Sequence, residues 1–195
     1  MGERIIVTGF EPFSDFKNNI SQEIVELISA EDVTDFKIST SILSVDEIGS
    51  REISDRIESG EKIGAVLHLG FSESATEILL ERYARNKFQM RIPDNSGRKL
   101  TSGTISPGTS KLETKLPTNF IEKYLMGLSA IRWNEDAGGF VCNETYFRSL
   151  LASSSNDLPL VLFIHLPSER IIPLEEQYEK ILMICKSISQ ILNLD

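Results

Sequence analysis

AGGFVCNETYFRSLL, residues 137–151, is the most informative stretch of the sequence. It is interpreted as glycines, a short apolar strand, a cysteine and then a helix, with Cys142 at the junction. Asn143 and Glu144 are suited to cap this helix and to form its first turn. A thiol at a helix N-terminus lies at the positive end of the helix dipole, which favours the thiolate form. The stretch therefore predicts a reactive cysteine at a strand-to-helix turn.

The next apolar run, LVLFIHLP at residues 160–167, predicts a strand that must stop at Pro167. His165 stands at the carboxyl end of this strand. In an open α/β sheet, the carboxyl ends of the strands are where reacting groups meet. The chain has two cysteines and two histidines, and only Cys142 and His165 pair two groups that both stand at strand ends. The two segments together suggest a Cys–His pair.

Strand and helix signals alternate along the rest of the chain. Apolar runs predict strands at residues 5–7, 36–43, 63–69 and 130–133. Helices are expected from Ser21 onward, from Asp46 to Gly60, near residues 119–128, and over residues 174–192. Such alternation predicts an α/β fold: a single three-layer α/β/α domain over residues 1–195, with a twisted, mainly parallel central sheet.

Two segments carry weaker signals. ILLERYA at residues 78–84 is compatible with a helix or with a strand, and the residues that lead to Pro93 look extended. Residues 94–117 are rich in Ser, Gly, Thr, Lys and Pro and hold few aliphatic side chains. Long loops in compact domains are often functional lids or mobile segments. We therefore expect a loop rather than a regular element over residues 94–117.

Composition limits the classes of function. The formal charge is −9, from 20 basic and 29 acidic side chains, and it disfavours nucleic acid as a partner. No apolar run approaches the length of about 18 residues that suggests a membrane span, and no leader pattern is evident. The two cysteines make no disulfide framework and show no metal-ligand spacing. We expect a cytoplasmic protein with no cofactor, no metal and no membrane partner.

The cysteines and histidines also have structural explanations. Cys185 lies on the apolar face of the last expected helix, which favours a core thiol. His68, inside VLHLG, is expected to be a hydrogen-bonded core histidine. On setting alone, Cys142 fits a nucleophile and a buried spacer equally well. His165 likewise fits a base and a structural histidine equally well.

A Cys–His pair needs a third group that orients the imidazole and stabilises its charged form. Glu81 is a candidate because it interrupts the otherwise apolar segment ILLERYA. A buried carboxylate must have a partner. Taken alone, these residues favour an ion pair of Glu81 with Arg82 or Arg85.

Two further stretches permit both a structural and a functional interpretation. RIPDNSG at residues 91–97 predicts a surface turn, because Pro93 fixes φ, Asp94 and Asn95 bond their own backbone, and Gly97 allows a positive φ. Phe10 and Phe13 follow the first strand. They fit either core packing or the lining of a small-molecule pocket.

Several of these segments together resemble the pyroglutamyl peptidases, also called pyrrolidone carboxyl peptidases. VTGFEPF at residues 7–13 is similar to the family's opening block, and Asn19 with Ser21 to the Asn-x-Ser that follows it. The later blocks also appear in the family's order: VLHLG (66–70), ATEILLERYARNK (75–87), RIPDNSG (91–97), EDAGGFVCNETYFRSL (135–150) and FIHLP (163–167). The resemblance extends along most of the chain.

The resemblance implies a cysteine exopeptidase that removes N-terminal pyroglutamate (5-oxoproline) from peptides through a thioester intermediate. It implies that Cys142 is the nucleophile, His165 the base and Glu81 the orienting carboxylate. It also implies that Arg91 lies near the nucleophile and helps to form the oxyanion site. The substrate-binding residues that it implies are Phe10, Phe13, Asn19, Phe71, Phe140 and Val141.

By the same resemblance, Asn19 holds the first loop or contacts the pyrrolidone ring. The aromatic residues Phe10, Phe13 and Phe140 pack around that ring. Family members often form homo-oligomers, and a dimer or a tetramer is the expected assembly, whereas animal-type members are monomers.

Two stretches depart from the family's pattern. Bacterial members often carry Gly-Gly where this chain has Ser14 and Asp15, and Gly-Gln-x-Gly-Gly where it has Gly70 to Ser74. The second stretch is closer to the animal-type sequences. The departures bear on substrate specificity and leave the triad untouched. Two other functions stay open: a non-catalytic binder of a small molecule or peptide on the same fold, and a cysteine amidase of different substrate range.

Overall fold

The fold is built on a six-stranded sheet. The computed structural model describes residues 4–31, 36–155, 157 and 159–192. The expectation that the chain carries no leader rests in part on residues 1–3, which lie outside the described residues. In spatial order, the strands of this sheet are β2 (Ile38–Leu43), β1 (Ile5–Phe10), β3 (Ala65–Phe71), β8 (Leu160–Leu166), β4 (Ile78–Glu81) and β7 (Ile131–Asn134). β1, β2, β3 and β8 are parallel, whereas β4 runs antiparallel to β8 and parallel to β7.

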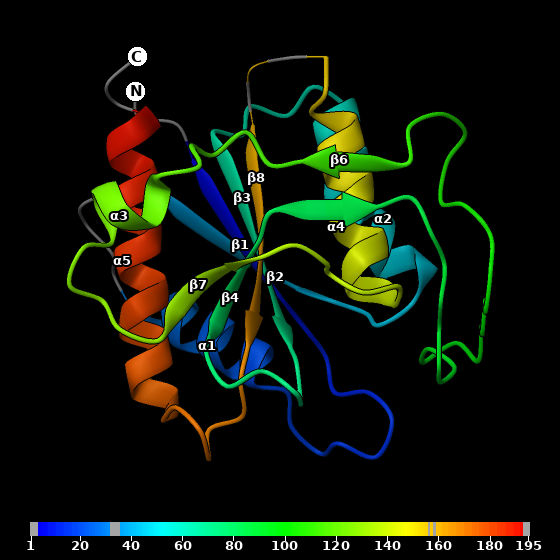
Figure 1. The fold of residues 1–195 in the computed structure, drawn as a ribbon, viewed down its shortest axis with the longest axis horizontal. Coiled ribbons are helices and arrows are strands. Elements are labelled where there is room, and N and C mark those ends of the chain that lie inside the picture. Colours follow the sequence, from blue (N-terminus) through cyan, green and yellow to red (C-terminus); the bar gives the residue numbers. More distant parts are fainter. Residues whose placement is uncertain (1–3, 32–35, 156, 158, 193–195) are drawn as a thin grey trace.

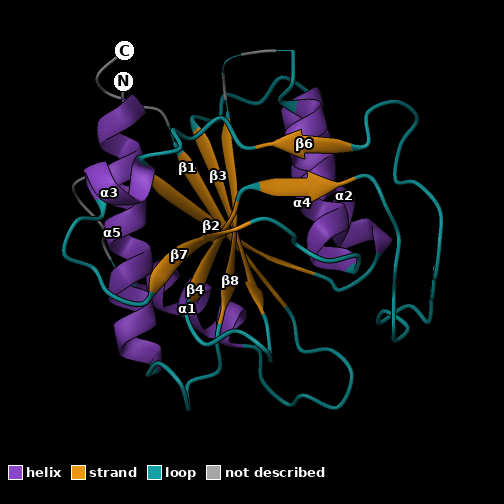
Figure 2. Cartoon of the chain, viewed as in Figure 1, coloured by secondary structure: helices purple, strands orange, loops and turns teal. Residues whose placement is uncertain are grey.

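Helices cover both faces of this sheet (Figures 1 and 2). On one face lie α1 (Ile20–Ala30), α3 (Phe120–Tyr124) and α5 (Leu174–Leu192), and on the other lie α2 (Glu47–Glu58) and α4 (Val141–Ala152). A separate hydrophobic cluster fills the space between the sheet and each helical layer. The strands β1 and β3 are buried almost throughout, as expected for a sheet covered on both sides. The predicted three-layer α/β fold with a mainly parallel sheet is confirmed.

The boundaries of several elements differ from the sequence prediction. β1 continues to Phe10, three residues beyond the expected end, and α3 is much shorter than the predicted 119–128 helix. Helix α1 is capped by Asn19 and not by Ser21, because the Asn19 side chain accepts a hydrogen bond from the Ser21 N–H at 3.1 Å. The Ser21 hydroxyl instead accepts a bond from the Phe10 N–H at 3.0 Å, which ties the start of α1 to the end of β1.

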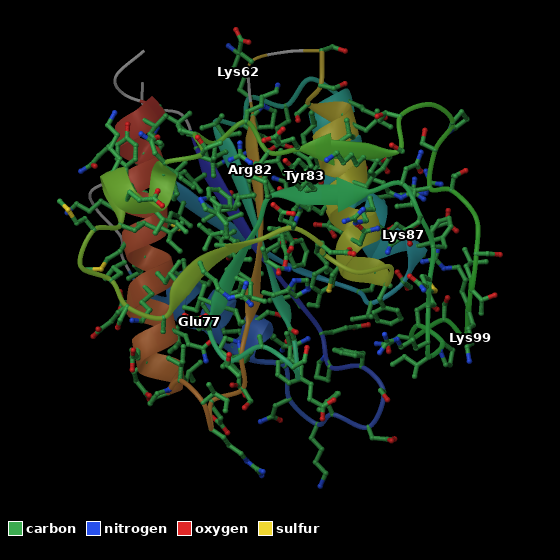
Figure 3. The ribbon with its side chains drawn as sticks, in the orientation of Figure 1. Lys62, Glu77, Arg82, Tyr83, Lys87 and Lys99 are labelled. Atoms are coloured by element: carbon green, nitrogen blue, oxygen red, sulfur yellow. The ribbon has the colours of Figure 1, made fainter. Side chains whose placement is uncertain are left out.

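The ambiguous segment at residues 78–84 contributes to two strands in two different sheets. β4 ends at Glu81, and after Arg82 the chain enters β5 (Tyr83–Arg85), which pairs with β6 (Lys111–Glu113). The expectation of a loop without a regular element over residues 94–117 is therefore wrong at β6, because that strand is set by its pairing with the distant β5. Between β5 and β6 the chain makes a long excursion at the side of the molecule remote from α5, where the Lys99 side chain lies (Figures 1 and 3). The side-chain amide oxygen Oδ1 of Asn86 anchors this excursion by accepting bonds from the Ile105 and Ser106 N–H groups.

The segment around Cys142 differs from its prediction in a way that matters for function. No strand precedes the cysteine in residues 137–140; Phe140 occupies the N-cap position, and α4 begins at Val141. Cys142 is therefore inside the first turn of the helix. Asn143 does not cap the helix: its side chain accepts a bond from the Arg85 N–H and donates one to the Arg85 carbonyl, both at 2.8 Å. These two bonds fix the start of α4 against β5.

Within residues 4–31, 36–155, 157 and 159–192, no helix combines the length and apolar character needed to cross a membrane. Nor do those residues contain a group of three or more His, Cys, Asp or Glu side chains arranged to hold a metal ion.

Candidate active site

Cys142, His165 and Glu81 line one cavity of about 420 Å³, which we call the catalytic cavity. They come from three elements: Cys142 from the first turn of α4, His165 from the carboxyl end of β8, and Glu81 from the carboxyl end of β4. The loops that follow β1, β3 and β8 lie at the end of the sheet where β8 finishes, at the lower edge of the view in Figure 1. The sheet thus brings together three groups that are far apart in the sequence.

The antiparallel pairing of β4 with β8 positions Glu81 against His165. In this register Glu81 lies opposite Phe163, and His165 lies opposite Leu79. Glu81 and His165 are therefore diagonal neighbours on one face of the sheet, within reach of long side chains. His165 Nδ1 and Glu81 Oε1 are 2.8 Å apart.

Glu81 is fully buried, and its carboxylate has a second partner. The Asn134 side-chain amide donates to Oε2 of Glu81 at 2.9 Å and to Oε1 at 3.1 Å. The ion pair with Arg82 or Arg85 that the residues alone favoured is wrong, because those guanidinium groups pair with Glu113 and Asp136 instead. Two partners that fix both oxygens hold the carboxylate in one orientation toward the imidazole.

The electrostatic setting favours a protonated imidazole at residue 165. Burial lowers the pKa of His165, but hydrogen bonds to Cys142 and Glu81 and the charges of both groups outweigh it and raise the pKa to about 10. The imidazole of His165 thus interacts with the Glu81 carboxylate on one side and the Cys142 sulfur on the other. The arrangement can therefore supply a nucleophile and a proton donor side by side.

The backbone around Cys142 is closely packed. A Cβ atom at Gly70 would lie 2.7 Å from Cζ of Phe163 and 3.1 Å from Sγ of Cys142, so glycine leaves the room that the sulfur and the ring occupy. The N-cap residue Phe140 makes no side-chain cap bond, and Glu144 is the first residue of α4 whose N–H bonds back into the helix. The N–H groups of Val141, Cys142 and Asn143 are thus unpaired within the helix and lie at the positive end of its dipole.

Comparison with known proteins assigns this chain to a family. Residues 3–183 match the family described as pyroglutamyl peptidase. The chain belongs to the pyroglutamyl peptidase family. It is thereby placed among the peptidases, as the resemblance in its motifs implied.

Individual relatives agree with this assignment. The pyrrolidone-carboxylate peptidase of Pyrococcus furiosus is 32% identical over 169 residues, which cover 84% of this chain and 80% of the relative. The crystal structure of pyrrolidone carboxyl peptidase from Fervidobacterium islandicum AW-1 has a TM-score of 0.86 at 27% identity, covering 96% of this chain and 99% of that one. The enzyme from Thermococcus litoralis matches the fold with a TM-score of 0.88 at 22% identity, over 99% of this chain and 96% of that one.

The substrate-binding residues that the family resemblance implied divide into two groups. Phe13, Phe71 and Phe140 line the catalytic cavity. Phe10 and Val141 are buried in the core and do not line it; the ring centroid of Phe10 lies 6.3 Å from that of Phe163. Of the two aromatic residues with two possible interpretations, Phe13 therefore lines the cavity and Phe10 packs in the core.

Asn19 and Arg91 are not among the residues that line the catalytic cavity. Asn19 is buried, caps α1, and donates to the carbonyl oxygen of Glu11 at 3.1 Å, so it holds the first loop. Arg91 is exposed and is not among the residues that line the catalytic cavity. RIPDNSG forms the turn that its composition predicts: the Asp94 carboxylate accepts from the Ser96 N–H, and Gly97 has a φ of +85°.

Sequence reasoning missed several residues of the family site. Ser72, Ser74 and Asn134 line the catalytic cavity, and Asn134 also binds the carboxylate of Glu81. A polar residue at the end of the predicted strand 130–133 was the available signal for Asn134. Without the sheet order, nothing connected that strand with Glu81.

The other histidine and cysteine are structural, as predicted. His68 lies in the core, 2.8 Å from the Thr8 hydroxyl and 3.0 Å from the Ser149 hydroxyl. Burial lowers the pKa of His68 to about 3. Cys185 is fully buried, and burial raises the pKa of its thiol to about 12. Neither group is available for the chemistry of the cavity.

Proposed function

We propose that this chain is a cysteine exopeptidase that removes N-terminal pyroglutamate from peptides through a Cys142–His165–Glu81 triad. One observation carries the proposal: Cys142 and the hydrogen-bonded His165–Glu81 pair face one cavity in a member of the pyroglutamyl peptidase family. The names of its relatives, pyrrolidone-carboxylate peptidases, support the substrate class.

In the first half of the proposed reaction, the Cys142 sulfur attacks the carbonyl carbon of the pyroglutamyl group, with His165 holding the proton of the thiol. A C–S bond forms, and the carbonyl oxygen becomes an oxyanion. The unpaired N–H groups at the start of α4, including that of Cys142, are placed to donate to this oxygen. One such donor typically contributes about 10²–10³ in rate.

The C–N bond then breaks as the imidazolium of His165 protonates the departing amine, which leaves a thioester on Cys142. A water molecule attacks the thioester, and its proton passes to the imidazole. The C–S bond breaks, and pyroglutamate leaves while the proton returns to the thiolate–imidazole pair. The hydrogen bond between Glu81 and Nδ1 keeps Nε2 directed to the sulfur throughout.

Recognition in this proposal depends on the lactam ring. A pyroglutamyl terminus has no charged amine, so the site must hold a flat ring with one N–H and one C=O. Phe13, Phe71 and Phe140 supply aromatic surface in the cavity. A site that pairs polar groups of its substrate can reject an analogue lacking them by about 10⁴–10⁵. N-terminal proline lacks the ring carbonyl and is expected to be a poor substrate.

The test is hydrolysis of a pyroglutamyl chromogenic amide. We expect turnover by the unaltered protein and loss of it in Cys142→Ser with the fold retained by circular dichroism. Cys185→Ser is the matched control, because its thiol is buried in the core away from the cavity, and it should remain active. Turnover that survives Cys142→Ser contradicts the nucleophile assignment.

The two alternative functions have separate readouts. A non-catalytic binder would show no turnover, yet a pyroglutamate analogue would protect Cys142 from alkylation. A cysteine amidase of different range would cleave prolyl and pyroglutamyl amides equally well.

Four other predictions from the sequence remain part of this proposal: Arg91 near the oxyanion, one domain over residues 1–195, a dimer or tetramer, and a cytoplasmic location. Loss of activity in Arg91→Ala would support the first of them.

A further inference from the structure

A second cavity lies beside the catalytic cavity. It measures about 380 Å³, and its lining includes Phe16, Phe71, Glu23, Glu73, Glu169 and Arg170. Phe71 lines both cavities. The second cavity is formed where the loops after β1, β3 and β8 meet the start of α1, at the same end of the sheet as the triad (Figure 1).

The segment after β3 forms a shared wall between the two cavities. Its residues alternate, since Ser72 and Ser74 line the catalytic cavity while Glu73 lines the second one. A chain that passes over Phe71 therefore leaves the triad and meets the Glu73 carboxylate next.

An aromatic row connects the two cavities. Ring centroids are 5.8 Å apart between Phe140 and Phe13, 5.5 Å between Phe13 and Phe16, and 5.2 Å between Phe16 and Phe71. The row begins at the N-cap of the helix that carries Cys142 and ends in the second cavity. Such a surface suits the methylene stem of a long side chain, and aromatic faces also attract a cation.

The charge of the second cavity is negative. Three carboxylates, those of Glu23, Glu73 and Glu169, face a single guanidinium, that of Arg170. Among the residues that the model describes, none of these three carboxylates forms an ion pair. A cationic side chain would therefore find carboxylates that are not already neutralised.

We propose that the second cavity is a subsite for the residue that follows pyroglutamate, and that it selects substrates with Lys or Arg at that position. This inference rests on the proposed function. The pyroglutamyl ring fills the catalytic cavity, the scissile amide lies at Cys142, and the next side chain passes Phe71 with its stem along Phe16. The cationic end lies among the carboxylates of Glu23, Glu73 and Glu169.

Three substrates that differ in one side chain test the charge preference: pyroglutamyl-lysine amide, pyroglutamyl-glutamine amide and pyroglutamyl-glutamate amide. We expect kcat/KM to fall in that order, with about tenfold between Lys and Glu at low salt, because exposed charge pairs contribute only modestly and Glu also adds repulsion. The preference should shrink as ionic strength rises. Equal kcat/KM for the three substrates overturns the subsite.

Variants on a single helix then locate the preference. Glu23 and Glu26 both lie on α1, but only Glu23 lines the second cavity. Glu23→Gln should lower the Lys-to-Glu ratio of kcat/KM by about twofold to fivefold, and Glu26→Gln should leave it unchanged. Glu73→Gln, outside the helix, should lower it similarly. Equal ratios in all the variants and the unaltered protein overturn the subsite.

The outcome for the proposed function is separate. A chromogenic pyroglutamyl amide carries no amino-acid side chain after the ring, so its cleavage depends on the triad and ring site alone. Cleavage of that amide without charge preference among the peptides leaves the proposed function standing and removes the subsite. No cleavage of any pyroglutamyl substrate overturns both.

Discussion

Gly70 controls the space available to the Cys142 sulfur. Any side chain at this position would meet the ring of Phe163, which is buried and lies 4.8 Å from the His165 ring, centroid to centroid. A side chain at residue 70 would therefore press on both the Phe163 ring and the Cys142 sulfur. A single methyl group at residue 70 is therefore a sharp probe of the site.

We expect Gly70→Ala to lower kcat/KM for a pyroglutamyl amide at least tenfold, because the added Cβ would lie 3.1 Å from Sγ of Cys142. Overpacking of this kind typically costs about 1–3 kcal/mol of stability, so the variant should still fold. Steady-state kinetics and urea unfolding on the same preparation measure the two effects. Unchanged kinetics would show that the sulfur has more room than the structure gives it.

The charge of Glu81 should control the alkaline limit of activity. In the proposed mechanism, His165 must be protonated to donate to the leaving amine, and its pKa is raised to about 10, so activity should fall as the pH rises through that value. Glu81→Gln removes one of the contributions that raise this pKa. We expect a loss of about 10²–10⁴ in kcat and an alkaline limb moved to lower pH.

Profiles of kcat/KM between about pH 6 and pH 11 measure the Glu81 effect. Glu77→Gln is the matched control, because Glu77 is on the same segment but pairs with the exposed Arg132. Its side chain lies near β7, at the lower left of the view in Figure 3. The Glu77 profile should overlay that of the unaltered protein; an identical shift in both variants would argue against a specific Glu81–His165 pair.

At the scale of elements, Arg98 joins the loop after β5 to the start of α4. Its guanidinium lies 2.7 Å from Oε2 of Glu144 and 2.8 Å from Oδ2 of Asp94, and both carboxylates are buried. Burial lowers the pKa of the Arg98 guanidinium, but the bonds to Glu144 and Asp94 outweigh it and raise that pKa. Burial raises the pKa of Asp94, but the hydrogen bonds from Arg98 and Ser96 outweigh it and lower that pKa. Glu144 also pairs with Arg148 on its own helix.

We expect Arg98→Met to lower the free energy of unfolding by about 3 kcal/mol, since it leaves two buried carboxylates short of a partner. Arg51→Met is the control. Arg51 forms an exposed i,i+4 pair with Glu47, and such pairs contribute about 0.3–0.5 kcal/mol. Chemical unfolding of the two variants gives the comparison. Equal losses would mean that the buried network adds nothing beyond a surface pair.

The elements also show how far the sequence could be interpreted. β8 and α5 follow their predicted ranges closely, because an apolar run ended by Pro167 and a helical apolar period are local signals. The start of α4 could not be placed, since Phe140 occupies an N-cap position without a capping side chain. The split of residues 78–85 into β4 and β5 depends on pairing with β8 and β6, which are distant in the sequence.

The same distinction applies to the site. Cys142 and His165 could be chosen from their places at element ends. The partner of Glu81 could not, because the residues alone favoured the neighbouring Arg82 or Arg85, and only the antiparallel register of β4 and β8 places His165 beside it. The contact of Asn134 with Glu81 could not be predicted for the same reason, because only the sheet order places β7 beside β4.

At the scale of the whole molecule, His68 connects β1, β3 and α4 through its bonds to Thr8 and Ser149. Its pKa is lowered to about 3 in the fold, so the folded protein keeps it neutral while the unfolded chain takes up a proton near pH 6.5. The stability from this group is therefore complete above about pH 6.5 and is lost as the pH falls toward 3. Between pH 6.5 and pH 5 the loss should be about 1.5 kcal/mol.

Urea unfolding at several pH values checks this slope, and His68→Gln should flatten it. His165 cannot cause the loss: its pKa is raised, so its contribution is complete below about pH 6.5 and is lost only as the pH rises toward 10. Glu61 and Asp94, whose pKa values are lowered, lose their contributions below the window, near pH 4 and under. A flat stability between pH 6.5 and pH 5 would contradict the neutral His68.

The position of Cys142 as the second residue of α4 has a consequence for the enzyme as a whole. In the proposed mechanism, the sulfur that attacks and the amide hydrogens that receive the oxyanion belong to one turn of helix. When that turn frays, as helix ends do, both are lost at the same moment, and no partly competent state is left behind. Activity should therefore be lost completely whenever this one turn unfolds. The two hydrogen bonds between the Asn143 side chain and the Arg85 backbone hold the turn in its folded form.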